Sequence, residues 1–346
     1  MGLSVSLLVL TATSTVYVGS KLSAGNRLMP LEPQELEDTQ LTLGQALIIP
    51  VSSSICLLLL FFFFAYLQYI LMGIVILVGS SALCQLTSLA LQNSCFRTGS
   101  KLALAISLCA TTVAIINWIA TGNLFVYNLL GCSLCIVFIS TLRFPSLKIA
   151  VICLSLLVVY DIFWVFCSEY FFEKNVMVEV ATKVASNPAF EVGKYFQWEL
   201  FKYINPKLEL PMKLMFPNFA TKRFIMLGLG DIALPGALVA YALRCDMELN
   251  REKEEDRVED VESGEGSTLL HHATTSKTQT ALFNTTMGGY FVGLIAAFVG
   301  NTLSGHPQPA LIYLVPGVIG TLIWKAWHIG KFNEVWQGPT KIHQSA

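Results

Sequence analysis

Two aspartates lie deep inside long apolar stretches of the sequence, where a carboxylate is costly. Asp161 falls within residues 147–170, and Asp231 falls within residues 224–243. A charged side chain at the centre of a membrane helix costs about 2.5–3.5 kcal/mol on insertion scales, so an acid at such a depth is a functional candidate by default. The chain's four other aspartates lie outside the deep parts of its apolar stretches.

The two aspartates are expected at the same depth. Asp161 stands nine residues before Tyr170, where one stretch ends, and Asp231 stands seven residues after Phe224, where the next begins. At about 1.5 Å per helical residue, both carboxyls then lie roughly 10–14 Å below the same membrane surface. Because the two helices are consecutive in the sequence, the carboxyls can face each other.

A facing pair of carboxyls predicts hydrolysis by acid–base catalysis. Two carboxyls within about 3 Å of each other share a proton, because both cannot ionise at once. One can then take a proton from a water that attacks a peptide carbonyl, while the other donates to the developing oxyanion and later to the leaving amine. This is aspartic protease chemistry, which needs no cofactor and no metal. A proton- or cation-coupled transporter that uses the two acids as a relay is the alternative.

The residues around Asp231 predict a weakened helix. Gly228 and Gly230 precede the aspartate and allow close approach to the backbone. Pro235 follows four residues later and lacks the N–H that would bond the Asp231 carbonyl, so the helix is expected to open at the aspartate. Glycine and proline also serve packing in membrane helices, and that interpretation stays open.

The composition indicates a polytopic membrane protein. The chain has 346 residues, of which 54% are hydrophobic and 13% charged, whereas a soluble domain has about 25% charged residues. A helix needs about 20 apolar residues to cross the bilayer core. We therefore expect an all-α fold with nine transmembrane helices, formed by residues 2–19, 44–66, 68–91, 102–121, 124–142, 147–170, 224–243, 284–303 and 309–328.

The basic residues predict the orientation of these helices. Lys and Arg gather in the connections at 21–27, 97–101, 143–148 and 244–277, which share one side of the membrane, whereas the short connections opposite carry none. Short basic connections stay in the cytosol. The N-terminus is then lumenal and the C-terminus cytosolic. Eight further basic residues lie in the 171–223 connection, which is long enough to weaken the rule.

The same plan predicts the domain organisation. One integrated domain is expected, with a five-helix membrane region over 1–142 and a catalytic four-helix region over 143–346. The catalytic region would carry a lumenal loop over 171–223 and an acidic cytosolic linker over 244–283. Within that linker, residues 246–267 are rich in acidic side chains, and we expect them to be solvated and disordered.

Three short motifs stand in order on three of the expected spans. They are YD at Tyr160–Asp161, GLGD at Gly228–Asp231 and QPAL at Gln308–Leu311. Together they resemble the signal peptide peptidase and presenilin superfamily of GxGD intramembrane aspartyl proteases. The sequence around them is similar to the third branch of the signal peptide peptidase-like proteins. The intact set speaks against an inactive relative, and so against a non-catalytic protein that only traps membrane helices.

The resemblance implies a role for each matched residue. Asp161 and Asp231 would form the catalytic pair. The residues that would shape the site and bind substrate are Tyr160, Gly228, Leu229, Gly230, Pro309, Ala310 and Leu311.

Orientation and resemblance together predict the partners. The charge bias gives the catalytic helices the orientation of signal peptide peptidases, opposite to that of presenilins, which fits type II single-span membrane proteins as substrates. For this branch the resemblance implies glycosyltransferases, cut in Golgi or endoplasmic reticulum membranes and released into the lumen. Residence at the plasma membrane and a homo-oligomeric state are left open. The lipid bilayer is the main solvent, and no nucleic-acid partner is expected.

Overall fold

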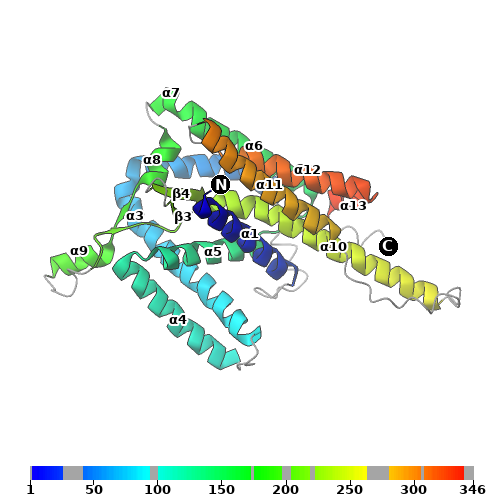
Figure 1. The fold of residues 1–346 in the computed structure, drawn as a ribbon, viewed down its shortest axis with the longest axis horizontal. Helices are drawn as coiled ribbons and strands as arrows, with labels where there is room; N and C mark the ends of the chain where they lie inside the picture. The colour runs from blue at the N-terminus through cyan, green and yellow to red at the C-terminus, as the bar shows by residue number, and fades with distance from the viewer. Residues whose placement is uncertain are drawn as a thin grey trace. The chain divides into compact units, whose positions relative to one another are not determined.

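A computed structural model describes residues 2–25, 42–93, 100–172, 175–196, 204–218, 223–262, 280–304 and 308–338 (Figure 1). The helices are α1 (Leu3–Ala24), α3 (Leu43–Asn93), α4 (Ser100–Thr121), α5 (Leu124–Thr141), α6 (Leu147–Ile162), the π-helix η1 (Phe163–Cys167), α7 (Ser168–Phe172), α8 (Val176–Thr182), α9 (Pro188–Tyr195), α10 (Leu229–Glu262), α11 (Ala281–Ser304), α12 (Leu311–His328) and α13 (Phe332–Gln337). The strands are β1 (Ala185–Ser186), β2 (Lys207–Leu208), β3 (Lys213–Asn218) and β4 (Arg223–Gly228).

The all-α class is confirmed, whereas the count of nine transmembrane helices is not. Within the described residues, seven helices are long and apolar enough to cross a membrane. Two expected spans, 44–66 and 68–91, lie in the single 51-residue α3, whose backbone departs from helical geometry at Phe63 (φ −114°, ψ 23°). Helix α10 is not among the seven, since charged residues follow its apolar first half.

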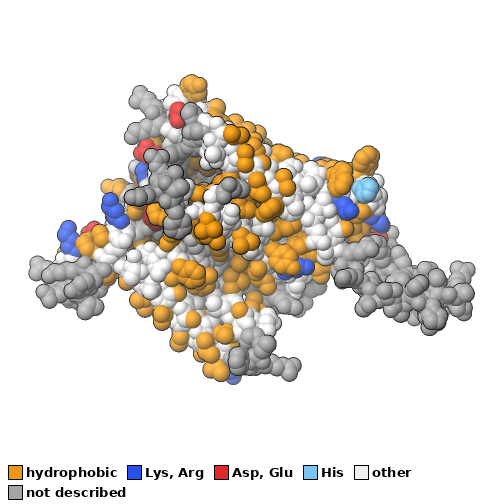
Figure 2. Space-filling model, in the orientation of Figure 1, with side chains coloured by type: hydrophobic (Ala, Val, Ile, Leu, Met, Phe, Trp, Pro, Cys, Tyr) orange, Lys and Arg blue, Asp and Glu red, His pale blue; other side chains and the backbone are white. Residues whose placement is uncertain are grey.

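The surface of the described helices fits a lipid environment. Large hydrophobic side chains are exposed along α3 and α4, including Leu77 and Val113. Figure 2 shows hydrophobic side chains spread widely over the visible face, with few charged side chains among them. Water would penalise such a surface, whereas lipid tails solvate it. The chain is therefore an integral membrane protein.

The expectation of a helix from residue 224 is wrong at its start, because residues 223–228 form strand β4. This strand pairs antiparallel with β3, with Lys213 opposite Gly228 and Asn218 opposite Arg223. Aromatic and β-branched residues such as Phe224 and Ile225 suit a strand as well as a membrane helix. The partner strand decides between the two.

The expectation of disorder over 246–267 is wrong for residues 246–262, which continue α10 as a helix. Acidic and basic side chains are interspersed along this part, and Arg251 lies 3.4 Å from Glu248, one turn earlier. Such pairs each stabilise a helix by about 0.2–0.5 kcal/mol. Residues 263–267 lie outside the described residues.

The expected 171–223 loop contains ordered elements that pack on the membrane helices. The Asn187 side chain donates to the carbonyls of Ile119 on α4 and Asn205, and accepts from the Ala189 amide at the start of α9. The Asn128 side chain of α5 makes two hydrogen bonds to the Met215 backbone on β3, at 2.7 and 2.9 Å. Buried amides that satisfy backbone groups in this way fix the loop on α4 and α5.

The described residues fall into two compact units. The first comprises Met1–Thr15, Val51–Phe138 and Tyr160–Ala233, and the second comprises Val16–Pro50, Ile139–Val159 and Leu234–Ala346. Both parts of the expected domain plan, 1–142 and 143–346, contribute to each unit. The expectation of one integrated domain stays a prediction.

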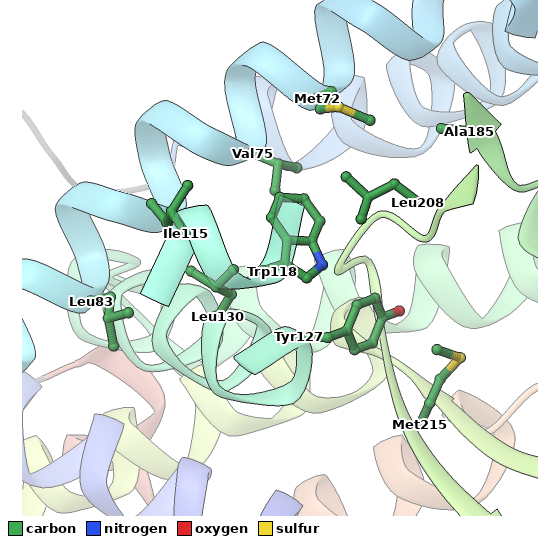
Figure 3. Packing of buried hydrophobic residues seen from close by; sticks show 10 residues of the cluster. All are labelled: Met72, Val75, Leu83, Ile115, Trp118, Tyr127, Leu130, Ala185, Leu208 and Met215. Atoms are coloured by element: carbon green, nitrogen blue, oxygen red, sulfur yellow. The ribbon is translucent and has the colours of Figure 1, made fainter. Parts of the chain in front are cut away.

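The core of the first unit is centred on Trp118 of α4, which is 1% exposed. Figure 3 shows its indole between Val75 of α3, Leu130 and Tyr127 of α5 and Leu208 of β2. The Tyr127 hydroxyl donates to the Leu210 carbonyl at 3.0 Å. This core joins the 171–223 region to three membrane helices and thereby positions the hairpin of β3 and β4.

In the second unit, α11 and α12 lie side by side (Figure 1) and pack through glycines. A Cβ at Gly317 would lie 2.8 Å from the Gly289 carbonyl, and a Cβ at Gly293 would lie 3.0 Å from the Tyr313 carbonyl. Small residues of this kind let membrane helices approach closely. The start of α12, where the QPAL motif lies, is thus held by backbone-to-backbone packing.

Candidate active site

Asp161 lies in the last turn of α6 and is 3% exposed. The chain continues directly into the π-helix η1, a rare form that often marks functional sites. Side chains hold this segment in place, because the Trp164 carbonyl accepts from Ser168 at 2.6 Å and the Val165 carbonyl accepts from Asn175 at 2.7 Å. The Trp164 indole donates to the Ser54 hydroxyl of α3 at 3.1 Å. Asp161 therefore stands beside a fixed distortion of its helix.

Asp231 lies in the first turn of α10, immediately after strand β4. The backbone amide of Gly228 donates a hydrogen bond to its carboxylate. The Leu229 amide donates to the Met212 carbonyl at 3.1 Å, which joins the start of α10 to the residue before β3. The positive end of a helix dipole favours an anion in the first turn. The amide at the end of β4 and the N-terminus of α10 therefore both stabilise the ionised carboxylate of Asp231.

The structure brings the two acids together in the first unit. Their carboxyls are close enough to interact electrostatically. The Oδ2 atom of Asp161 is buried and has no hydrogen-bond partner within the described part of the chain. A buried unsatisfied oxygen costs about 1–3 kcal/mol, and a proton shared with Asp231 or a water bound to both carboxyls would satisfy it. The arrangement suits the general acid–base chemistry of a carboxyl pair.

The two glycines before Asp231 have different surroundings. A Cβ at Gly228 would lie 3.1 Å from Asp231 Oδ2. A Cβ at Gly230 would meet no atom within 4 Å, and this residue is exposed. Gly228 therefore permits the close approach of the carboxylate to its own backbone, whereas Gly230 leaves an open surface beside the pair.

The other matched residues of the first unit surround the acids. Leu229 packs against Gly131 of α5, with its Cδ2 atom 3.4 Å from a Cβ built there, and its carbonyl accepts from the Cys135 thiol at 3.6 Å. The Tyr160 ring is tilted against that of Trp164, with centroids 6.5 Å apart. Leu229 thus anchors the start of α10, and Tyr160 borders the π-helix.

Pro309, Ala310 and Leu311 lie in the second unit, at the start of α12. The Ala310 carbonyl accepts from the amides of Tyr313 and Leu314, each at 3.1 Å. The Tyr313 hydroxyl donates a short hydrogen bond to the side-chain carbonyl of Gln308, just before the proline. The position of these three residues relative to the carboxyl pair stays a prediction.

Two parts of the site, the β3–β4 hairpin and the π-helix, are not predicted by the sequence. The alternation of large and small side chains over 213–218 and 223–228 is weak, and no local signal marks a π-helix. The available clue was two polar residues at the end of an apolar stretch, Ser168 and Asn175, whose side chains donate to carbonyls of the π-helix.

Among the described residues, no group of three or more His, Cys, Asp or Glu side chains could hold a metal ion.

A helical membrane protein in which a carboxyl at the end of α6 interacts with a carboxyl at the start of α10 has the arrangement of an intramembrane aspartyl protease. The family model described as signal peptide peptidase matches residues 33–342. Signal peptide peptidase-like 1 of Arabidopsis thaliana is 35% identical over 96% of this chain and 92% of its own length. The rice (Oryza sativa subsp. japonica) protein of the same name is 33% identical over 97% of this chain and 93% of its own length. The chain belongs to the signal peptide peptidase family.

More distant relatives match a shorter part of the chain. Signal peptide peptidase-like 2B of Rattus norvegicus is 30% identical over 60% of this chain and 30% of its own length. Family membership supports a protease and gives no support to the transporter alternative. Membership of the third branch within the family stays a prediction.

Proposed function

We propose that this protein hydrolyses peptide bonds in or beside the transmembrane segment of other membrane proteins, with Asp161 and Asp231 as the catalytic pair. The observation that carries the proposal is the electrostatic interaction of the two carboxyls together with the unsatisfied Oδ2 of Asp161. If the two carboxylates were instead each paired with a cation, they would not interact with each other in this way, and Oδ2 of Asp161 would have a partner. A carboxyl pair that shares one proton and binds one water accounts for both.

The surroundings of the two acids favour different roles. Burial disfavours the ionised form of both acids, but Asp231 also accepts the Gly228 amide and sits at a helix N-terminus, two features that favour its ionised form. Asp161 is buried, and its Oδ2 accepts no hydrogen bond within the described residues. We therefore assign Asp231 as the base that takes a proton from water and Asp161 as the acid.

The reaction then follows in two steps. The water oxygen forms a bond to the peptide carbonyl carbon as its proton passes to Asp231, and the Asp161 proton passes to the developing oxyanion. In the second step the C–N bond breaks and the oxyanion proton returns to Asp161. The leaving amine takes its proton from Asp231 and not, as expected from the sequence, from the acid that protonates the oxyanion, because Asp161 has already given its proton away. Each carboxyl ends in the protonation state in which it began, and one water is consumed for each bond cut.

The hairpin before Asp231 suits an extended substrate. Strand β4 pairs only with β3 among the described strands and ends three residues before Asp231. A substrate segment that adds as a further strand would be held by backbone hydrogen bonds beside the acids. The exposed Gly230 leaves room for that segment. Substrate binding by Tyr160, Gly228, Leu229 and Gly230, and by Pro309, Ala310 and Leu311, is part of the proposal.

The proposed substrates are type II single-span proteins, with glycosyltransferases as the implied class and the Golgi or endoplasmic reticulum as the compartment. The support is the distribution of basic residues, which sets the direction of the catalytic helices. The test is reconstitution of the purified protein with a type II substrate and with the same transmembrane sequence in type I orientation. Sequenced products from the type II substrate alone would support the proposal. Cleavage of the type I substrate alone would contradict it.

A further inference from the structure

A buried arginine lies outside the candidate active site, where α10 leaves the predicted span 224–243. The Nε and Nη2 atoms of Arg244 are buried and have no hydrogen-bond partner in the described part of the chain. The residue as a whole keeps part of its surface exposed. The nearest acid in sequence, Asp246, is engaged elsewhere, since its two oxygens accept the amides of Leu282 and Phe283 at 3.1 and 2.8 Å.

A second arginine lies near the first. Arg143 lies in the short connection between α5 and α6 and is close enough to Arg244 to interact with it electrostatically. The start of α6 is held against α10, because the Leu147 backbone bonds the Tyr241 hydroxyl. The same hydroxyl donates to the Val335 carbonyl of α13 at 2.6 Å. The start of α6, helix α10 and helix α13, all in the second unit, therefore meet at Tyr241, one turn before Arg244.

Both arginines are charged at neutral pH, because the guanidinium group stays protonated in proteins. Burial, and after it the charge of Arg143, lowers the pKa of Arg244 to about 10. Burial also lowers the pKa of Arg143. The buried Nε and Nη2 donors of Arg244, close to a second positive charge, are unfavourable unless an anion accepts hydrogen bonds from them.

The two guanidinium groups of Arg244 and Arg143 are suited to bind a phosphate group. Planar guanidinium groups bind phosphate through paired hydrogen bonds. The site lies at the edge of a predicted span on the basic side of the membrane, where pockets between helices bind anionic lipid headgroups. We propose that Arg244 and Arg143 bind the phosphate of an anionic lipid headgroup and that this lipid stabilises the contact of α10 with the α5–α6 connection.

The test uses the full-length protein in phosphatidylcholine nanodiscs. Three conditions are compared: no addition, added phosphatidylinositol phosphate, and added inorganic phosphate. Bound lipid is counted by native mass spectrometry, and the unfolding midpoint Tm is measured. We expect the phosphoinositide to bind and to raise Tm, and Arg244→Gln to weaken its binding by about tenfold or more.

Three further variants sharpen the test. Arg244→Lys keeps the charge but loses the planar fork, so we expect an intermediate loss of lipid binding. Arg143→Gln should weaken binding as well, and it carries the test if Arg244→Gln does not fold. Arg251→Gln is the matched control, since this residue of α10 is already paired with Glu248 and its loss should leave binding unchanged.

Two outcomes would overturn the proposal. Equal lipid binding by the wild type, Arg244→Gln and Arg143→Gln would show that the arginines serve packing alone. A rise of Tm with inorganic phosphate but not with the phosphoinositide would overturn the assignment to a lipid. Neither outcome depends on protease activity, so the test stands apart from the proposed function.

Discussion

The Gly228 amide donates a hydrogen bond to the carboxylate of Asp231, and a Cβ at the same glycine would lie only 3.1 Å from Asp231 Oδ2. The residue that stabilises the carboxylate is therefore also the one whose lack of a Cβ lets it approach. A Cβ at Gly230, two residues later, would have no atom within 4 Å. The contrast indicates that Gly228 serves the position of the acid, and we predict that Gly230 serves substrate binding.

Substitution of the two glycines by alanine should have different effects. Gly228→Ala should move the Asp231 carboxylate, and a displacement of about 1 Å can lower turnover roughly a hundredfold. Gly230→Ala should leave Tm unchanged or higher, because alanine favours a helix over glycine by about 1 kcal/mol. It should raise KM if a substrate backbone passes over this surface. Equal turnover in Gly228→Ala and the wild type would contradict the proposed role of Gly228.

Pro235 lies inside α10, four residues after Asp231, and cannot donate to the Asp231 carbonyl. Pro235→Ala supplies that donor and favours the helix by about 3 kcal/mol. We expect a more rigid first turn, a lower kcat and an unchanged or higher Tm. Full activity with a lower Tm would instead mean that the proline serves packing alone. Both quantities should be measured on the same purified variant.

Tyr313 connects α12 to the residue before Pro309 by its bond to Gln308. Tyr313→Phe removes the hydroxyl but keeps the ring. A single hydrogen bond contributes about 0.5–1.5 kcal/mol net, so kcat/KM should fall roughly two- to tenfold, mainly through KM. Gln308→Ala should have the same effect, and the double variant should be no worse than either. Additive losses would show that the two residues act separately.

Asn284 begins the only N-x-S/T sequence that can accept a glycan, and its side chain is exposed on α11. The predicted orientation places it on the cytosolic side, so we expect no glycan on the native protein. A sequon introduced into the 171–223 region by Lys194→Asn with Phe196→Thr should be glycosylated. An endoglycosidase shift that is lost in Asn284→Gln would reverse the orientation.

The sequence predicted those parts of the fold that depend on long apolar stretches and on local motifs. Residues 102–121 and 284–303 are helical as expected, and the helix expected over 309–328 is present as Leu311–His328. The cost of a carboxyl in lipid is enough to mark Asp161 and Asp231 as functional candidates. Such features depend on residues close together in the sequence.

The parts that could not be predicted depend on distant contacts. Residues 223–228 form a strand because β3 supplies the partner, and so short a segment carries no information about that partner. The π-helix after Asp161 depends on Ser54, Ser168 and Asn175, which come from three different segments. The helix over 246–262 continues α10 through a stretch whose charge alone favoured disorder.

We propose that Asp161 and Asp231 act as one catalytic pair. The most direct measurement is the cleavage rate of a reconstituted type II substrate by the wild type, Asp161→Ala and Asp231→Ala, with equal membrane insertion checked for each. Both substitutions remove a carboxyl from lipid, so neither should impair insertion. We expect no detectable product from either variant, while the wild type cuts the substrate. Product release by either variant at close to the wild-type rate would contradict the proposal.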